Sequence, residues 1–296
     1  MQTELCEVDN VDDAVAERGT AGATLETVLR CTSSFHVNVD KAAAVIRANR
    51  QLLEHPRQNF AVLDPLISHI ESKIFFANAA DELVFNLKHN RESVKLLNDA
   101  YCAWETALEQ IFSKRICLDD ANSLNDYRLN SRFQRLLKRE TSMLRGRQHK
   151  RALFIGSGPF PISSIWLHRL LGIPVDGLDH SFDAVQRSRE MLEKLGLDRS
   201  ISVIHETSHS YDVSAYDVIL IALLAKPKMA ILENIYASAK DDCEIVCRTS
   251  FGLRSVIYEP TVMSPDMLER FSIEDARIIS GSSDDTISSL LLKKVV

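Results

Sequence analysis

Apolar and polar residues follow two different rhythms along the chain, and the change falls near residue 147. From Lys41 to Arg147 the apolar residues recur every three to four positions, which places them on one face of an α-helix. Pro56 and Pro65 are expected where a helix starts or breaks, and the polar residues 119–123 are expected to join two helices. The pattern predicts an all-helical bundle made of KAAAVIRANRQLLE, NFAVLDPLISHIESKIFF, ADELVFNLKHNRESVKLL, DAYCAWETALEQIFSKRI and SRFQRLLKRETSMLRG.

Beyond residue 147 short apolar runs alternate with helical stretches. The predicted strands are RALFIGSGP, IPVDGLD, ISVIHE, AYDVILIALL, EIVCRTS and ISSLLLKKV. This alternation predicts an α/β fold with a doubly wound, mainly parallel Rossmann-like sheet. We therefore expect a helical bundle domain over residues 1–147, with residues 1–20 disordered, and a Rossmann-like domain over residues 148–296.

Composition is that of an ordinary globular protein, with 45% hydrophobic and 26% charged residues. The longest apolar run, residues 218–225, is far shorter than the roughly 20 residues that span a bilayer. The first residues are acidic and lack the pattern of a secretory signal, so a cytoplasmic protein is expected. The net charge of −6 disfavours nucleic acid as a partner.

The six cysteines are scattered and form no CxxC pair, so reduced thiols are expected. Cys243 and Cys247 are four residues apart in a predicted strand, and an even spacing puts both on one face. Packing in the core is therefore favoured for this pair over metal ligation.

A glycine turn closes the first predicted strand, at Gly156, Ser157, Gly158 and Pro159. In parallel sheets, ligands bind at the carboxyl ends of strands. Pro161 replaces the last glycine of the dinucleotide pattern, which favours a nucleoside without phosphates. Asp179 ends the second predicted strand 21 residues after Gly158, where a carboxylate can accept hydrogen bonds from ribose hydroxyls. The alternative is a plain turn with a capping aspartate.

Residues 205–209 match the zinc motif H-E-x-x-H, with His205, Glu206 and His209 in the positions of ligands and base. That motif requires a helix, whereas ISVIHE is a strand and the residues after it do not have a helical pattern. A loop that lines the nucleoside pocket is therefore expected instead.

Glu105 and Glu109 are four residues apart and share one face of a mostly apolar helix. By pattern alone, a solvated edge is favoured over a functional pair. Tyr127, Arg248, Arg254 and Tyr258 have ordinary interpretations as well: an amphipathic aromatic, charges at a strand end and a half-buried tyrosine.

Seven segments together nevertheless carry a resemblance: AYCAWETALEQIFSKRI, LNDYRLNSRFQRLLKRE, ALFIGSGPFPISSIWL, VDGLDHSFDAVQRSREMLEKLG, YDVILIALLAKPKMAILENI, CRTSFGLRSVIYEP and DDTISSLLLKK. Over residues 95–294 the chain resembles the nicotianamine synthase family, including its bacterial members that make aminobutyryl-histidine precursors of opine metallophores. SGPFPISS is the most specific segment, because an ordinary methyltransferase seldom has Gly-Ser-Gly-Pro-x-Pro here.

This resemblance implies a helical domain above a class I methyltransferase-like site for S-adenosylmethionine, which serves as co-substrate. The family transfers the 3-amino-3-carboxypropyl arm instead of the methyl group, and methylthioadenosine leaves. The protein selects among three electrophilic carbons by aiming an amine at the Cγ of the methionine moiety. The expected acceptor is a free amino acid, with histidine as first choice, in metallophore biosynthesis. NSLND replaces the aromatic FPYY run of plant members, so a smaller or altered acceptor is expected.

The resemblance also implies roles for individual residues. Glu109, or failing it Glu105, would take the proton of the acceptor amine, and Tyr127 would orient that amine. The residues expected to bind S-adenosylmethionine are Gly156, Ser157, Gly158, Pro159, Asp179, His180, Glu206, Ala222 and Leu223. The residues expected to bind the substrate are Arg248, Arg254 and Tyr258. No metal is expected to be required by the enzyme.

Three other functions stay open. Nicotianamine itself could be made by successive transfers and condensation. An ordinary small-molecule methyltransferase would explain Asp179 and the glycine turn but not the helical glutamates. A catalytically inactive S-adenosylmethionine-binding module would require those glutamates to face solvent. The expected partners are the amino-acid substrate, a downstream opine dehydrogenase and a second copy of the chain in a homodimer, with neither nucleic acid nor membrane.

Overall fold

The computed structural model describes residues 35–77, 81–82, 85, 90–118, 124–145 and 148–295. The disorder expected for residues 1–20 and the joint expected at residues 119–123 fall outside these described residues. Among the helices that are described, none combines the length and the apolar composition needed to cross a membrane.

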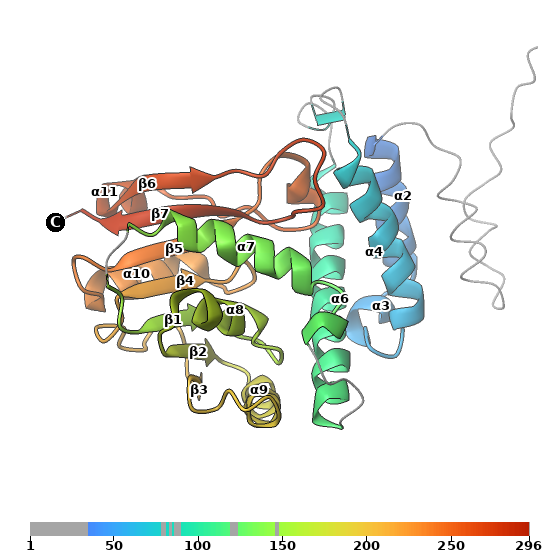
Figure 1. The fold of residues 1–296 in the computed structure, drawn as a ribbon. Coiled ribbons are helices and arrows are strands. Elements are labelled where there is room, and N and C mark those ends of the chain that lie inside the picture. Colours follow the sequence, from blue (N-terminus) through green and yellow to red (C-terminus); the bar gives the residue numbers. More distant parts are fainter. Residues whose placement is uncertain are drawn as a thin grey trace, which may run out of the picture.

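The N-terminal part is helical, as its apolar spacing predicts (Figure 1). Pro56 lies between two helices, as expected. Pro65 lies inside a helix, so the break expected there is wrong: burial of the apolar face outweighs one missing backbone hydrogen bond. The elements are α2 (Phe35–Ala48), α3 (Gln51–Glu54), α4 (Phe60–Phe75), α6 (Arg91–Cys117), the 3-10 turn η2 (Leu124–Asp126) and α7 (Asn130–Met143).

Helix α6 is a single helix of 27 residues, although its sequence was divided between two predicted segments. The Asn90 side chain caps its first turn by accepting hydrogen bonds from the backbone N–H groups of Glu92 and Ser93. Glu92 in the first turn and Lys114 and Arg115 in the last turn complement the helix dipole. These capping and charge interactions stabilise both ends of α6.

The C-terminal part is a seven-stranded sheet in the order β3-β2-β1-β4-β5-β7-β6. The strands from β3 to β5 are parallel, whereas β7 is antiparallel to both of its neighbours, so the predicted doubly wound, mainly parallel sheet is confirmed. The strands are β1 (Ala152–Ile155), β2 (Val175–Asp179), β3 (Ile201–His205), β4 (Val218–Ile221), β5 (Glu244–Thr249), β6 (Phe271–Arg277) and β7 (Ser288–Lys294). The connecting elements are α8 (Ile162–Leu171), α9 (Phe182–Lys194), α10 (Lys228–Ser238), the 3-10 helix η3 (Gly252–Val256) and α11 (Pro265–Arg270).

The edge strand β6 and the short helix α11 were not predicted from the sequence. Strand β6 reads FSIEDAR and shifts register between Ile273 and Asp275. This irregularity interrupts the alternation of apolar and polar residues that identifies a strand, and only one face of an edge strand is buried.

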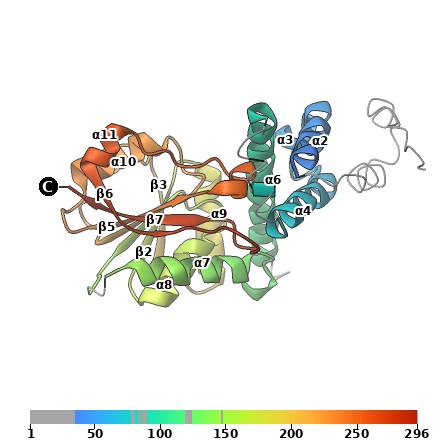
Figure 2. The same cartoon turned by 90° about the horizontal axis from the view of Figure 1, so that it is seen from above.

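Helices α7, α8 and α9 cover one face of the sheet, and α10 and α11 cover the other (Figure 2). Cys243 and Cys247 are buried in the core under α10, as their even spacing predicts. On the opposite face, one apolar cluster joins α4, α6 and α7 to β1 and β4. The division at residue 147 stays a prediction, since this core continues across it.

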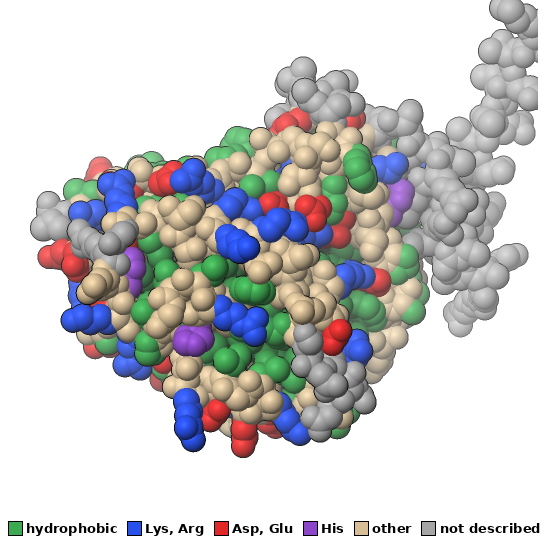
Figure 3. Space-filling view, in the orientation of Figure 1, with side chains coloured by type: hydrophobic (Ala, Val, Ile, Leu, Met, Phe, Trp, Pro, Cys, Tyr) green, Lys and Arg blue, Asp and Glu red, His purple; other side chains and the backbone are tan. Residues whose placement is uncertain are grey.

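The long helix α6 stands at the carboxyl edge of the parallel strands, between the sheet and helices α2 and α4 (Figures 1 and 2). On the face of the molecule in Figure 3, Lys and Arg side chains are interspersed with Asp and Glu side chains. That face therefore presents no single-sign field for a charged ligand.

Candidate active site

A cavity of about 920 Å³ lies between α6 and the carboxyl ends of the parallel strands. Its size falls within the roughly 300–1,000 Å³ typical of small-molecule sites. Helix α6 contributes one wall, with Cys102, Glu105, Thr106, Glu109, Gln110 and Lys114. The opposite wall comes from the segments that follow β1, β2, β3 and β4, and it includes nine predicted residues: Gly156, Ser157, Gly158, Pro159, Asp179, His180, Glu206, Ala222 and Leu223.

The glycine turn after β1 requires its glycines. Gly156 and Gly158 have φ angles of 84° and 67°, which side-chain-bearing residues rarely adopt. A Cβ on Gly156 would lie 3.0 Å from the side chains of Ala222 and Ala225, and one on Gly158 would lie 3.0 Å from Oε2 of Glu109. The bare backbone therefore lets the turn approach both the β4 loop and α6.

Asp179 holds this turn from the end of β2. Its Oδ2 accepts a 2.8 Å hydrogen bond from the N–H of Gly158, and its Oδ1 accepts a 2.9 Å hydrogen bond from the N–H of Ser181. Each carboxylate oxygen keeps a second lone pair for a ligand hydroxyl. The exposed ring of His180 lies beside it, with Nδ1 3.6 Å from Oδ1 of Asp179.

Glu105 and Glu109 face the cavity from consecutive turns of α6. Glu105 is only 5% exposed, so the solvated edge suggested by its pattern is wrong for this residue. Burial raises the pKa of Glu105 to about 7, against the opposing effect of a hydrogen bond from Tyr258. Burial also raises the pKa of Glu109 well above its usual range, and the negative charges of Glu105 and Asp179 add to this.

Tyr127 is buried between the rings of Phe112 and Phe160 and is not among the residues that line the cavity. Its hydroxyl has no hydrogen-bond partner among the described residues. Burial raises the pKa of Tyr127, and the charges of Glu109 and Glu105 raise it further, so the phenol stays protonated. A buried hydroxyl without a partner is costly unless a ligand or water satisfies it.

Tyr258 and Arg248 line the cavity, but both have partners within the protein. The hydroxyl of Tyr258 donates a 2.8 Å hydrogen bond to Oε2 of Glu105. The guanidinium of Arg248 binds Glu140 on α7 bidentately, at 2.9 and 2.8 Å, and also donates to Ser163. Both partners of this ion pair are almost fully buried, so Arg248 fastens β5 to α7.

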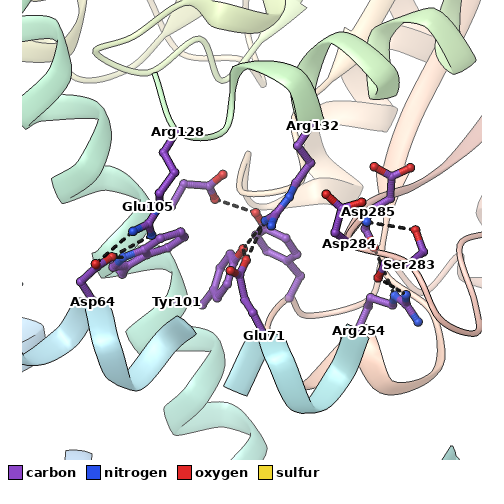
Figure 4. A network of polar contacts seen from close by, with 12 residues as sticks. Asp64, Glu71, Tyr101, Glu105, Arg128, Arg132, Arg254, Ser283, Asp284 and Asp285 are labelled. Carbon is purple, nitrogen blue, oxygen red and sulfur yellow. Dashed lines mark hydrogen bonds and ion pairs between the residues drawn. The ribbon is translucent and has the colours of Figure 1, made fainter. Parts of the chain in front are cut away.

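Arg254 is not brought to the cavity. It lies in η3, and its guanidinium donates to the carbonyl oxygens of Gly281, Ser283 and Asp285. Since these three acceptors lie in the loop between β6 and β7, Arg254 fastens that loop beside α7 (Figure 4).

The residues of the H-E-x-x-H match form a strand end and a loop, as predicted. His205 is the last residue of β3, and Glu206 to His209 line the cavity. In the part of the chain that the structure describes, no group of three or more His, Cys, Asp or Glu side chains is arranged to hold a metal ion.

One polar cluster beside the site was missed in the sequence. Arg132 donates a 2.6 Å hydrogen bond to Oε1 of Glu71, and the Tyr101 hydroxyl donates to the same oxygen at 2.6 Å (Figure 4). The ring of Tyr101 packs edge-on against that of Tyr258.

Glu140, the partner of Arg248, was also missed. Its burial could have been predicted from the sequence, because Glu140 falls on the same helix face as Phe133, Leu136 and Leu137.

Two known enzymes are similar to this chain in sequence. The chain is 26% identical over 214 residues to the L-histidine 2-aminobutanoyltransferase of Yersinia pestis, which covers 71% of this chain and 80% of that enzyme. It is 27% identical over 156 residues to nicotianamine synthase 1 of Oryza sativa subsp. indica, covering 49% of this chain and 46% of that enzyme. The chain thus spans about half the length of the plant relative.

The fold agrees with a solved structure. A crystal structure of an MtNAS variant in complex with S-adenosylmethionine superposes with a TM-score of 0.76 at 23% identity, and it covers 90% of this chain and 100% of that chain. Residues 73–295 match the family described as nicotianamine synthase protein, so the chain belongs to the nicotianamine synthase family.

Proposed function

We propose that this protein transfers the 3-amino-3-carboxypropyl arm of S-adenosylmethionine to the amine of a free amino acid, with histidine as the first candidate. One observation carries the proposal: two glutamates of α6, Glu105 and Glu109, line a cavity of about 920 Å³ together with the glycine turn. A methyltransferase needs no such pair. The match to a histidine 2-aminobutanoyltransferase over 80% of its length supports histidine as the acceptor.

The carboxyl edge of the sheet fits the nucleoside. The backbone of Gly156 and Gly158 is bare, and Asp179 has free lone pairs beside the turn. The loop after β4, with Ala222 and Leu223, would cover the base. Bound there, S-adenosylmethionine supplies an electrophilic Cγ and a thioether leaving group. Glu109 lies beside Gly158 at this end of the cavity, and a sulfonium bound there would lower its raised pKa and favour its charged form.

Glu105 is the better candidate for the base, although the sequence slightly favoured Glu109. A general base works best when its pKa lies near the working pH, and the pKa of Glu105 is about 7. Glu105 would take one proton from the acceptor ammonium. The neutral amine then attacks Cγ, the S–Cγ bond breaks, and its electron pair stays on sulfur. Tyr127 does not line the cavity, so it would act on the amine only through a group that reaches its unpartnered buried hydroxyl.

The test is to incubate the protein with S-adenosylmethionine and one amino acid at a time, and to weigh both products. Methylthioadenosine with a singly extended histidine supports the proposal. S-adenosylhomocysteine would indicate a methyltransferase, absence of both products a binding module, and a repeatedly extended product nicotianamine-type synthesis.

Two substitutions test the separate roles proposed for Glu105 and Glu109. Glu105→Gln should lower turnover by about 10²–10⁴, the usual contribution of a general base, while affinity for S-adenosylmethionine is retained. Glu109→Gln should weaken S-adenosylmethionine binding. The control is Glu233→Gln, because Glu233 is exposed on α10 and outside the cavity. Full turnover in both cavity variants would exclude this mechanism. We propose that no metal takes part, and undiminished activity after treatment with a chelator is the expected result.

A further inference from the structure

A second, much smaller cavity lies directly behind the proposed base. Its volume is about 10 Å³, close to the minimum that holds one water molecule. Four side chains line both this cavity and the large one: Glu105, Phe133, Tyr258 and Ile287. Glu105 and Tyr258, which are hydrogen-bonded to each other, therefore stand in the wall between the two spaces.

The small cavity has polar residues in its lining, beside the apolar Leu129, Phe133, Leu136 and Ile287. Arg132, Arg139, Asp285 and Thr286 line it together with Glu105. A buried water needs two to four such polar partners. Both cations are neutralised, since Arg132 lies 2.6 Å from Glu71 and Arg139 lies 2.5 Å from Asp285. A proton passing through this space therefore meets no net positive charge from these two pairs.

Solvent exposure increases from Glu105 through Asp285 to Asp284. Glu105 is 5% exposed. The side chain of Asp285 is 14% exposed, and that of its neighbour Asp284 is 62% exposed. Figure 4 shows Asp284 and Asp285 on the far side of Arg132 from Glu105, at the end of the β6–β7 loop. The small cavity thus lies between the proposed base and the molecular surface.

We propose that this second cavity is the outlet through which Glu105 returns its proton to solvent. The inference rests on the proposed function. An ammonium acceptor and a sulfonium donor give a secondary ammonium and a neutral thioether, so each transfer releases one proton. That proton passes from the acceptor nitrogen to Glu105, then to a water in the small cavity, and leaves past Asp285. The front face of Glu105 is covered by substrates or products during this time, because it lines the cavity that they occupy.

The test is a rapid-mixing experiment on the whole protein with S-adenosylmethionine and histidine, in weak buffer with a pH indicator. In the wild type, the proton should reach solvent at the rate of methylthioadenosine formation, before the products dissociate. Asp285→Asn removes the ion-pair partner of Arg139 beside the outlet and one of the two partners of Arg135, which keeps Asp284. It should leave formation in the first turnover unchanged and delay proton release about tenfold, the change that losing one favourable polar interaction makes to a rate.

Asp284→Asn is the matched control, since Asp284 also pairs with Arg135 but lines neither cavity. It should release its proton as the wild type does. Leu136→Phe narrows the small cavity by volume and should delay release in the same way as Asp285→Asn. The inference is overturned if the wild type releases its proton only together with its products, or if Asp285→Asn and Leu136→Phe release it as fast as Asp284→Asn. Absence of methylthioadenosine in the wild type would instead overturn the proposed function.

Discussion

The hydroxyl of Tyr258 donates a 2.8 Å hydrogen bond to Glu105, a residue 153 positions earlier in the chain. Both side chains are buried, one after β5 and the other on α6. This bond joins the sheet to the helical wall of the cavity at the residue proposed as the base. It also stabilises the charged form of Glu105 and so keeps the pKa of this carboxyl from rising further.

Replacing Tyr258 by phenylalanine should therefore move the pH profile of the reaction. Loss of the donor raises the pKa of Glu105, so the acidic limb of kcat/KM for the acceptor, near pH 7 in the wild type, shifts to higher pH. Tyr236→Phe on α10 is the control, because Tyr236 packs against Phe271 far from the cavity. If the Tyr258→Phe profile overlays that of the control, Tyr258 does not act on the base.

Glu105 should also make stability depend on pH. Its folded pKa of about 7 lies above the ordinary 4.5, so the folded state binds more protons than the unfolded state between these values. Its stabilising contribution is complete below about pH 4.5 and is lost as pH rises through 7, a total of about 3 kcal/mol. Urea unfolding at pH 5 and pH 8 should show a smaller difference for Glu105→Gln than for the wild type. An equal difference in both proteins would contradict the raised pKa.

Short sequence patterns predicted the part of the candidate site that is formed by the glycine turn, Asp179 and the glutamates of α6. The glycine turn after β1 and Asp179 at the end of β2 follow from short segments whose strands and turns are set by neighbouring residues. The shared face of Glu105 and Glu109 follows from helical periodicity alone. The doubly wound, mainly parallel sheet also follows from the alternation of strands and helices, whereas the order of its seven strands was not predicted.

The other half depends on contacts between distant segments. Arg248 lies in β5 and Arg254 lies in the turn that follows it. The neighbouring residues in the sequence do not show which of the two arginines lines the cavity. The buried Glu140, 108 positions earlier, pairs with Arg248. The turn of η3 directs Arg254 to the β6–β7 loop instead. Such choices depend on how α7 and β7 pack, which no local pattern encodes.

One substitution of Asp179 tests both its observed contact with the glycine turn and its proposed contact with the ribose. Its carboxylate holds the N–H of Gly158 and is the expected acceptor for the ribose hydroxyls. Asp179→Ala should weaken S-adenosylmethionine binding about ten- to a hundredfold, as expected for a lost charge-assisted acceptor. Calorimetry measures this, with the exposed Asp198→Ala as control. Unchanged affinity would remove Asp179 from the nucleoside site.

Gly158 allows the sharpest comparison, because the chain contains a matched glycine. Gly158 and Gly196 have φ angles of 67° and 65°, so alanine costs each a similar backbone strain, about 1 kcal/mol. The environments differ: a Cβ on Gly158 meets Glu109 at 3.0 Å, whereas a Cβ on Gly196 meets nothing within 4 Å. Both variants should therefore lose comparable stability in thermal unfolding.

Only Gly158→Ala should also lose function. Its methyl group displaces the Glu109 carboxylate from the glycine turn, so affinity for S-adenosylmethionine and turnover should both fall while Gly196→Ala keeps wild-type values. Calorimetry and methylthioadenosine formation measure the two effects separately. If Gly158→Ala binds and turns over like Gly196→Ala, the approach of α6 to the glycine turn has no part in the reaction, and Glu109 would have to be placed outside the S-adenosylmethionine site.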